Sequence, residues 1–240
     1  MSNQQQASFC YESIEPGYYD AIYKKGTGIQ SQWHRLKFAR VQKSLPESVH
    51  NLLDVGCGPG TFLGNFLPSS VKGIGVDIAA SQIEFAKNSY DFPHLNFICI
   101  KDYLPFDNDF FDVVTCIELI EHLSHTEFDF LLKEMKRVLK PGGILLLTTP
   151  NYAGAWPVVE FMVNKLSPVS YAHQHISKFR THSLQTLLQK AGFKVTVERY
   201  MGLAPFSAVF SDTLCHKISN WEQNTQKAYG MLLFALAEKL

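Results

Sequence analysis

The sequence has no excess charge of either sign, because 22 lysine and arginine residues are balanced by 22 aspartate and glutamate residues. A protein that binds nucleic acid usually presents a basic face, and an anionic membrane attracts a similar excess of positive charge. We therefore expect neither nucleic acid nor an anionic membrane surface among the partners of this chain.

Paired cysteines and long apolar runs are also lacking. The five cysteines are odd in number and include no C-x-x-C spacing, which indicates a reducing compartment. The longest apolar runs, Ile144 to Leu147 and Met231 to Ala237, fall far short of the roughly 20 residues that a membrane helix needs. Residues 1–6 are polar and do not resemble a secretory signal. We expect a cytoplasmic protein without an integral membrane segment.

Strand and helix patterns alternate along the chain, which predicts a single α/β domain over residues 1–240 with a doubly wound, mostly parallel, seven-stranded sheet. The expected strands are 51–55, 71–77, 95–100, 111–117, 144–149, 193–197 and 231–237. The expected helices are 32–45, one from Thr61, 80–88, one from the Ser124 capping box to Leu139, 156–166 and 181–191. A C-terminal helix is the alternative to the seventh strand, since leucine and alanine favour helix.

Three segments depart from this alternation. Residues 1–30 combine tyrosines with glycines and are expected to be irregular, either as a flap over a ligand or as a terminal segment packed on the domain. Residues 150–181 follow the fifth strand and are long for a loop, and long loops in compact domains usually carry function. We expect this insertion to form the wall that faces a second substrate. Residues 200–222 are left unassigned.

A glycine-rich turn, DVGCGPG at residues 54–60, follows the first strand, and Thr61 opens the helix behind it. Glycine tolerates positive φ and lets a ligand lie against the main chain, next to the N–H groups at the start of the helix. A dinucleotide fingerprint would place a further glycine at Thr61, and a P-loop would need Gly-Lys-Ser/Thr. The turn therefore predicts a nucleoside-like ligand that need not carry phosphate.

Two acids follow the next two strands. Asp77 ends the second strand about 20 residues beyond the turn, where a carboxylate takes up ribose hydroxyls. Asp102 follows the third strand and could accept from an adenine amino group, with the backbone of Tyr103 beside it. A solvated turn aspartate is the alternative for Asp102.

Polar residues also gather just past the fourth strand, where open α/β sheets hold their ligands. Glu118, Glu121, His122 and His125 raise the question of a metal, but their spacing is no recognised zinc pattern and His125 belongs to the expected capping box, so we predict none. His122, and His175 in the insertion, are candidate acid–base groups. Each has a structural alternative, in which His122 binds backbone and His175 fixes the insertion through a hydrogen bond.

Motifs from Gln32 to the C-terminus resemble those of the class I S-adenosylmethionine-dependent methyltransferases, especially the small-molecule enzymes grouped with the ubiquinone-biosynthesis O-methyltransferases. The matching pieces are LDVGCGPG (53–60), Asp77, DYLPF (102–106), FDVV (111–114), IEHL (120–123), LKPGG (139–143), TPN (149–151), HISKF (175–179) and AGF (191–193). The resemblance is specific for the fold and the cofactor, and weak for the substrate.

The resemblance implies S-adenosylmethionine as methyl donor, with the glycines near its methionine part, Asp77 on its ribose and Asp102 and Tyr103 beside its adenine. Ile117 and Glu118 would line its inner side. The implied cofactor-binding residues are Asp54, Gly56, Cys57, Gly58, Gly60, Asp77, Ile78, Asp102, Tyr103, Ile117 and Glu118.

Together with an apolar, aromatic insertion (Trp156, Phe161, Met162, Tyr171), the resemblance predicts methyl transfer to a small, fairly apolar acceptor, first of all to the oxygen of a phenol or quinol. A base is needed only where the acceptor must lose a proton. A carbon or nitrogen acceptor, a non-catalytic regulator that binds S-adenosylmethionine, and a homodimer are left open. A nicotinamide-dependent reductase is disfavoured by Thr61.

Overall fold

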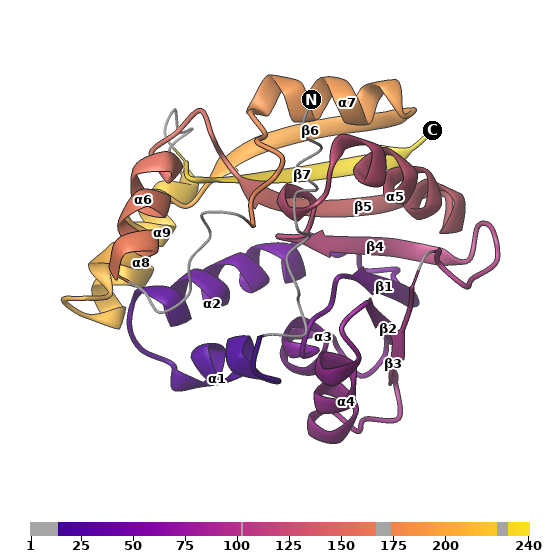
Figure 1. The fold of residues 1–240 in the computed structure, drawn as a ribbon, viewed down its shortest axis with the longest axis horizontal. Helices are drawn as coiled ribbons and strands as arrows, with labels where there is room; N and C mark the ends of the chain where they lie inside the picture. The colour runs from indigo at the N-terminus through magenta and orange to yellow at the C-terminus, as the bar shows by residue number, and fades with distance from the viewer. Residues whose placement is uncertain (1–13, 102, 167–173, 225–229) are drawn as a thin grey trace, which may run out of the picture.

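The computed structural model describes residues 14–101, 103–166, 174–224 and 230–240 (Figure 1). Its strands form one sheet in the order β3-β2-β1-β4-β5-β7-β6. Their bounds are β1 Asn51–Val55, β2 Lys72–Asp77, β3 Leu95–Cys99, β4 Phe111–Ile117, β5 Leu139–Pro150, β6 Phe193–Tyr200 and β7 Leu232–Lys239. The paired strands run parallel except at β7, which is antiparallel to β5 and β6. The predicted seven-stranded, mostly parallel sheet is confirmed.

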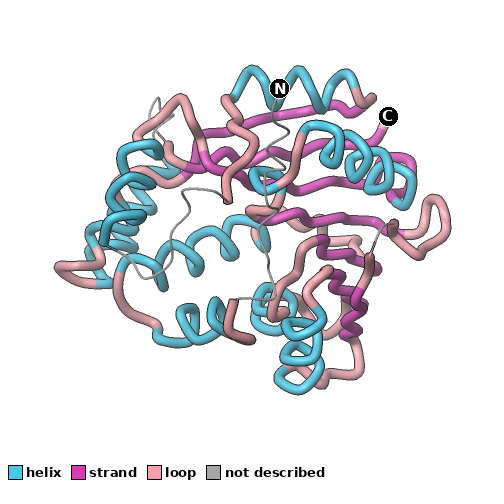
Figure 2. The backbone as a smooth tube through the Cα atoms, viewed as in Figure 1, coloured by secondary structure: helices cyan, strands magenta, loops and turns pink. Residues whose placement is uncertain are grey.

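Helices cover both faces of this sheet (Figure 2). Their bounds are α1 Tyr18–Lys25, α2 Ile29–Gln42, α3 Thr61–Phe66, α4 Ala80–Ser89, the 3-10 turn η2 Ile120–His122, α5 His125–Val138, α6 Trp156–Leu166, α7 Thr181–Lys190, α8 Ala204–Ser207 and α9 Asp212–Asn224. Within the described residues, each helix is too short or too polar to span a bilayer.

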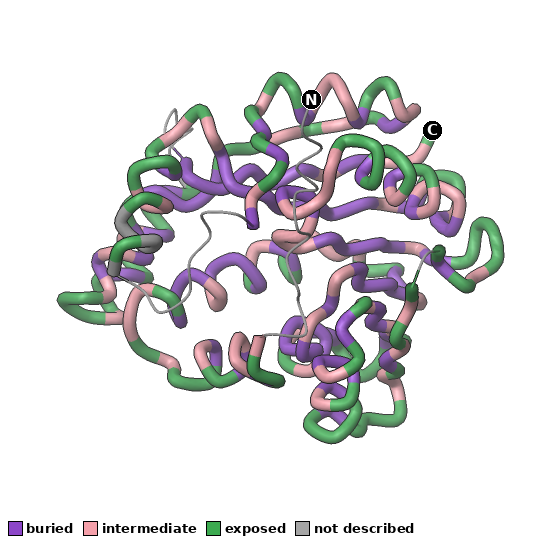
Figure 3. The backbone as a smooth tube through the Cα atoms, in the orientation of Figure 1, coloured by how far each residue is buried: buried purple, intermediate pink, exposed green. Residues whose placement is uncertain are grey.

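Two hydrophobic cores, one on each face, explain why the strands read as nearly continuous apolar runs. Successive side chains of a strand point to opposite faces, so Leu52 packs with α2, α3 and α4, whereas Leu53 packs with α5 and α7. Both leucines are fully buried. Figure 3 shows the same burial along the central strands. A parallel sheet covered on both faces requires this pattern.

The chain runs outward from β1 to β3 and then returns to place β4 on the other side of β1. The connections after β1 and β4 therefore leave the sheet toward opposite faces. In open α/β sheets, a crevice forms at the carboxyl ends of such a pair of strands and holds the ligand. The fold thus predicts a ligand site at the carboxyl ends of β1 and β4.

The expectation of an irregular N-terminal segment is wrong for its described part. Helix α1 occupies Tyr18–Lys25, and α2 begins at Ile29 instead of Gln32 and ends at Gln42. Gly17 and Gly26 flank α1 with φ of +77° and +78°. Gly17 caps the N-terminus of α1 and Gly26 caps its C-terminus, so the glycines bound a short helix and do not indicate an irregular chain.

Other differences concern element boundaries. Strand β5 begins at Leu139, five residues before the predicted Ile144, because α5 ends at Val138 and the chain pairs with Phe111 before a bulge. The unassigned stretch 200–222 contains α8 and most of α9. The predicted seventh strand is confirmed, since β7 pairs with both β5 and β6 and the alternative C-terminal helix does not form.

Candidate active site

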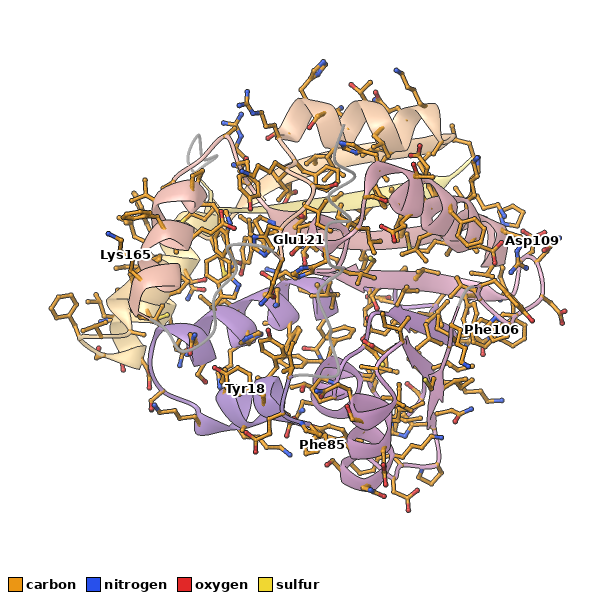
Figure 4. All side chains as sticks on the ribbon, in the orientation of Figure 1. Tyr18, Phe85, Phe106, Asp109, Glu121 and Lys165 are labelled. Atoms are coloured by element: carbon orange, nitrogen blue, oxygen red, sulfur yellow. The ribbon has the colours of Figure 1, made fainter. Side chains whose placement is uncertain are left out.

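A cavity of about 1240 Å³ lies at the carboxyl ends of β1, β2 and β4, where the strand order reverses. Its walls come from the loops after these strands, from α1 and α2, and from α6. Figure 4 labels two of the lining residues, Tyr18 on α1 and Glu121 after β4. The predicted residues that line this cavity are Asp54, Gly56, Cys57, Gly58, Asp77, Ile78, Ile117, Glu118, His122 and His175.

The three glycines of the turn serve different purposes, although all have positive φ, which favours glycine. A Cβ on Gly58 would meet no atom within 4 Å, so this position leaves room for a ligand. A Cβ on Gly56 would lie 2.9 Å from Leu119, and one on Gly60 would lie 2.7 Å from Phe97. Gly60 is not part of the cavity lining, and its role in this structure is the close packing of α3 on the sheet.

Two buried side chains lie beneath the turn. Asp54 is 2% exposed and accepts a hydrogen bond from Thr115 Oγ1 at 2.6 Å, which links β1 to β4. Burial raises the pKa of Asp54 to about 7. Burial, with Asp54 and Asp77 nearby, also raises the pKa of the Cys57 thiol well above its ordinary value. Cys57 is thus a small, unreactive residue in the floor of the site.

Asp77 holds the turn from the neighbouring strand. Its Oδ2 accepts the Gly58 N–H at 2.8 Å, and its Oδ1 accepts the Ala79 N–H at 2.9 Å. An ionised carboxylate only accepts hydrogen bonds, which is the chemistry that the hydroxyls of a diol require. Ile78, next in the chain, is 56% exposed and offers the cavity an apolar surface.

The predicted adenine side is only partly described. Asp102 lies outside the described residues. Tyr103 is 64% exposed and does not line the cavity, whereas the preceding residues Ile100 and Lys101 do. The structure therefore brings the end of β3 to the cavity and leaves the Tyr103 side chain in solvent.

Glu118 lies at the end of β4 in a left-handed conformation, with φ of +51°, which is rare outside glycine. Its carboxylate forms an ion pair with Lys37 and accepts a hydrogen bond from Trp33 Nε1 at 3.0 Å. Burial alone would raise the pKa of Glu118, but Lys37, His34 and these hydrogen bonds lower it below the ordinary value. An ionised carboxylate held against α2 thus faces the cavity.

His122 and His175 are neighbours, with ring centroids 5.1 Å apart. His122 Nδ1 lies 3.0 Å from the Gln174 carbonyl oxygen, and His175 Nδ1 lies 2.6 Å from Glu160 Oε1. Burial lowers the pKa of His122 to about 4 and also lowers the pKa of His175, although Glu160 opposes the second shift. Both imidazoles are therefore neutral near pH 7.

Glu121 completes a group of three side chains whose ligand atoms lie within 4.8 Å of one another, together with His122 and His175. Burial, and then Glu118, raise the pKa of Glu121 to about 8, and Thr149 Oγ1 donates to its Oε2 at 2.9 Å. These three residues could hold a divalent ion. The set considered from the sequence differs, because Glu118 is engaged by Lys37 and His125 begins α5 after the Ser124 capping box.

Helix α1 forms another wall, to which Tyr18, Tyr19 and Ile22 contribute. It is anchored by Asp20, which is 2% exposed. Asp20 accepts hydrogen bonds from Tyr90 and from Thr61 Oγ1, and it pairs with Lys24 at 2.8 Å. The described part of the N-terminal segment therefore both lines the cavity and packs on the domain.

Among the described residues, sequence reasoning missed several that contact the histidines, including Tyr152, Glu160 and Gln174. Glu160 alone left a usable signal. It is an acid within the apolar helix α6, and its side chain is only 14% exposed. An acid that is largely shielded from water in an apolar helix needs a polar partner, here His175.

Known proteins can be compared with this geometry. The family model described as a methyltransferase domain matches residues 29–198. The ubiquinone biosynthesis O-methyltransferase of Coxiella burnetii is 34% identical over 120 residues, which cover 49% of this chain and 50% of that protein. The probable methyltransferase ltbC of Aspergillus luteorubrus is 34% identical over 144 residues, which cover 51% of this chain and 50% of that protein. The chain thus spans about half the length of these curated relatives.

A solved structure supports the fold. The S-adenosylmethionine-dependent methyltransferase of Archaeoglobus fulgidus superposes with a TM-score of 0.65 at 20% identity, covering 92% of this chain and all of that one. The family model covers more than half of the chain and includes β1 to β5, whose carboxyl ends form the cavity. The chain belongs to the methyltransferase-domain family.

Proposed function

We propose that this enzyme methylates a hydroxyl oxygen of a small, largely apolar acceptor such as a phenol or a quinol. The observation that carries the proposal is the pair of neutral imidazoles, His122 and His175, on the cavity wall. A base contributes only where the acceptor gives up a proton. Neutral histidines in the cavity therefore favour a hydroxyl acceptor over an acceptor atom without a proton.

The cavity residues fit S-adenosylmethionine, which supplies a methyl group already activated by its sulfonium. Gly58 leaves open space beside the main chain, and Asp77 suits the two ribose hydroxyls. Ile78 offers a surface to the adenine ring, and Glu118 lines the cavity at the end of β4. The roles of Asp102 and Tyr103 beside the adenine stay predictions.

An uncharged acceptor is favoured by the walls around the histidines. The apolar residues that line the cavity include Leu119, Leu123, Leu131, Trp156, Val159 and Phe206. Near the histidines, Glu118 is neutralised by Lys37, and the raised pKa of Glu121 keeps that group protonated at neutral pH. A charged acceptor would lose its hydration without gaining an opposite charge there, which is costly.

The relatives add weaker support. The printed name of the Coxiella burnetii protein specifies O-methylation, but the match covers half of each chain. A carbon or nitrogen acceptor and a non-catalytic regulator are the alternatives. The four described cysteines form no disulfide, which agrees with the proposed cytoplasmic location. A homodimer stays a prediction that gel filtration with light scattering can test.

A substrate panel tests the proposal. Purified enzyme is incubated with S-adenosylmethionine and neutral phenols, catechols and hydroquinones, with amines and carboxylated phenols as the comparison, and release of S-adenosylhomocysteine is measured. We expect turnover with uncharged hydroxyl acceptors and a lower kcat/KM for carboxylated ones. Turnover confined to amines would contradict the proposal. Cofactor binding without turnover across the panel would favour the regulator.

The same panel decides whether a metal takes part. Glu121, His122 and His175 form a donor set, although the sequence predicts that no metal is used. Activity that is unchanged after treatment with EDTA would agree with this prediction. Activity that is lost in EDTA and restored by added zinc or magnesium would contradict this prediction.

A further inference from the structure

Thr61, the first residue of α3, stands where a dinucleotide-binding turn would have its third glycine, which packs the helix closely on the strand. In this chain the close packing falls to Gly60, where a Cβ would lie 2.7 Å from the ring of Phe97. The Thr61 side chain has another partner. It is buried, and its Oγ1 donates a hydrogen bond at 3.1 Å to Oδ1 of Asp20, 41 positions earlier in the chain. Thr61 therefore joins the glycine turn to α1.

Asp20 is the point at which three elements meet. The same oxygen, Oδ1, also accepts a hydrogen bond from the hydroxyl of Tyr90, the C-cap residue of α4. The other oxygen pairs at 2.8 Å with Lys24, whose side chain is 52% exposed. A buried carboxylate is tolerated only where such partners replace its water. One oxygen of Asp20 thus ties α1 to the start of α3 and to the end of α4.

The entry to α1 is fastened as well, by side chains of α4. Gln82 Oε1 accepts the Gly17 N–H at 3.1 Å, and its Nε2 donates to the carbonyl oxygens of Ile14 and Glu15. A Cβ on Gly17 would lie 2.2 Å from the ring of Phe85, which Figure 4 labels on α4. Helix α1 is therefore held along one face by α3 and α4.

Other side chains of α1 form part of the cavity wall. Tyr18, Tyr19 and Ile22 line the cavity, together with Gly58 and Thr61 from the turn and from the start of α3. Helix α1 has only eight residues, and a helix of this length is not stable by itself in water. The position of this wall relative to the glycine turn therefore depends on the contacts that fasten α1 to α3 and α4.

We propose that Asp20 is a positioning residue for the cofactor, which acts through Thr61 to hold α1 against the glycine turn. The inference rests on the proposed function, because it takes S-adenosylmethionine as the ligand of this part of the cavity. A ligand binds more tightly to a wall that is already in place, because binding then does not have to order that wall. Where α1 is in place in only a fraction of the molecules, the apparent affinity falls by that fraction.

The contacts of Asp20 also separate two kinds of N-terminal segment. A flap that closes over a bound ligand has few buried polar contacts in the free protein, and its amides become protected from hydrogen exchange only when the ligand binds. A fixed wall is protected before the ligand arrives. The buried hydrogen bonds from Thr61 and Tyr90 to Asp20 predict a fixed wall.

Hydrogen exchange tests this arrangement without any substrate. Exchange of the amides in residues 18–25 is followed by mass spectrometry in the wild type, Thr61→Val and Thr61→Ser. We expect α1 to be protected in the free wild type, to exchange about tenfold faster in Thr61→Val, and to keep its protection in Thr61→Ser, because serine retains the hydroxyl that Asp20 accepts. An unprotected α1 in the free wild type, or equal exchange in all three proteins, would overturn the proposal.

Calorimetry with S-adenosylhomocysteine tests the effect on binding. We expect about fivefold weaker binding or more in Thr61→Val, a larger loss in Asp20→Ala, and nearly normal binding in Thr61→Ser. Because Thr61→Val and Asp20→Ala break the same hydrogen bond, the double variant should bind no more weakly than Asp20→Ala alone. Fully additive losses would show that Thr61 acts independently of Asp20 and would overturn the proposal. If Asp20→Ala does not fold, the comparison of Thr61→Val with Thr61→Ser still decides.

Two variants control these measurements. Lys24→Gln removes the exposed ion pair of the same carboxylate but leaves its bond to Thr61, so exchange and affinity should stay normal. Val138→Ala weakens the core on the opposite face of the sheet and should lower stability without lowering affinity. An affinity that falls with stability in Val138→Ala as it does in Thr61→Val would overturn the positioning role. If the wild type does not bind S-adenosylhomocysteine, the proposed function fails, and hydrogen exchange still decides whether Asp20 and Thr61 hold α1.

Discussion

Lys37 and Glu118, which are 81 positions apart in the sequence, form an ion pair in the wall of the cavity. The Lys37 side chain is 3% exposed and that of Glu118 is 20% exposed. The pair joins α2 to the end of β4, and Trp33 donates to the second oxygen of the same carboxylate. The Glu118 carboxylate at the end of β4 is thus kept ionised by side chains of α2, a helix that precedes the sheet in the chain.

Removal of one partner of this ion pair should be costly. In Lys37→Met, Glu118 becomes a buried charge without its cation, so its pKa should rise and the free energy of unfolding should fall by about 3 kcal/mol. Lys37→Met with Glu118→Gln should recover most of that loss. Urea unfolding measures both values. The exposed pair Lys194–Glu238 is the control, and a Lys37→Met cost no larger than that of Lys194→Met would contradict the argument.

Asp77 should determine cofactor affinity. Asp77→Ala removes the proposed acceptor of the ribose hydroxyls and the acceptor of the Gly58 and Ala79 N–H groups. We expect calorimetry to show roughly 30-fold weaker binding of S-adenosylhomocysteine, or weaker still, equal to about 2 kcal/mol. Asp77→Asn should lose less, since one oxygen remains. Asp91→Asn, at an exposed position, should bind normally. Unchanged affinity in Asp77→Ala would refute the ribose assignment.

Alanine substitutions at Gly58 and Gly60 should distinguish a loss of ligand binding from a loss of packing. Alanine at Gly58 meets no protein atom, so Gly58→Ala should cost only the backbone strain of about 1–2 kcal/mol but should weaken S-adenosylhomocysteine binding at least tenfold. Alanine at Gly60 would press on Phe97 in addition, so Gly60→Ala should cost about 1–3 kcal/mol more stability and leave affinity nearly unchanged. Thermal melts with and without ligand measure both effects, and equal losses of affinity would count against this division.

Glu121 should make the fold less stable as pH rises. Its pKa in the folded protein is about 8, against 4.5 ordinarily, so the folded state keeps a proton that the unfolded chain releases. The free energy of unfolding should therefore fall between about pH 5 and pH 8, by about 4 kcal/mol from this group. In Glu121→Gln, the free energy of unfolding should not show the part of this decrease that comes from Glu121. Urea unfolding at several pH values compares the two proteins, and parallel curves would show that Glu121 is not protonated in the fold.

The glycine turn and the acid of β2 were predictable because they are local. Strand β1, the turn and α3 follow one another in the chain, and the spacing to Asp77 is set by a single α–β unit. The resemblance added the cofactor, and the family match confirms it. Helix boundaries near glycine were less predictable, since residues such as Gly17 and Gly26 occur both at helix ends and in irregular chain.

The partners of the histidines were not predictable from spacing. Glu160 lies 15 residues before His175, and Gln174 lies 52 residues after His122. Their meeting depends on how α6 and the chain after it fold back over the end of β4. No local pattern encodes that path, because the contacts are made by side chains from elements that pack only after the sheet has formed.

By itself, the sequence determined the alternation of strands and helices, the glycine-rich turn after β1 and the acid at the end of β2, because periodicity and short-range spacing encode them. Only the tertiary structure decided the charge state of Glu118 and Glu121 and the polar contacts of His122 and His175. Those properties depend on burial and on hydrogen-bond partners, which come from distant parts of the chain.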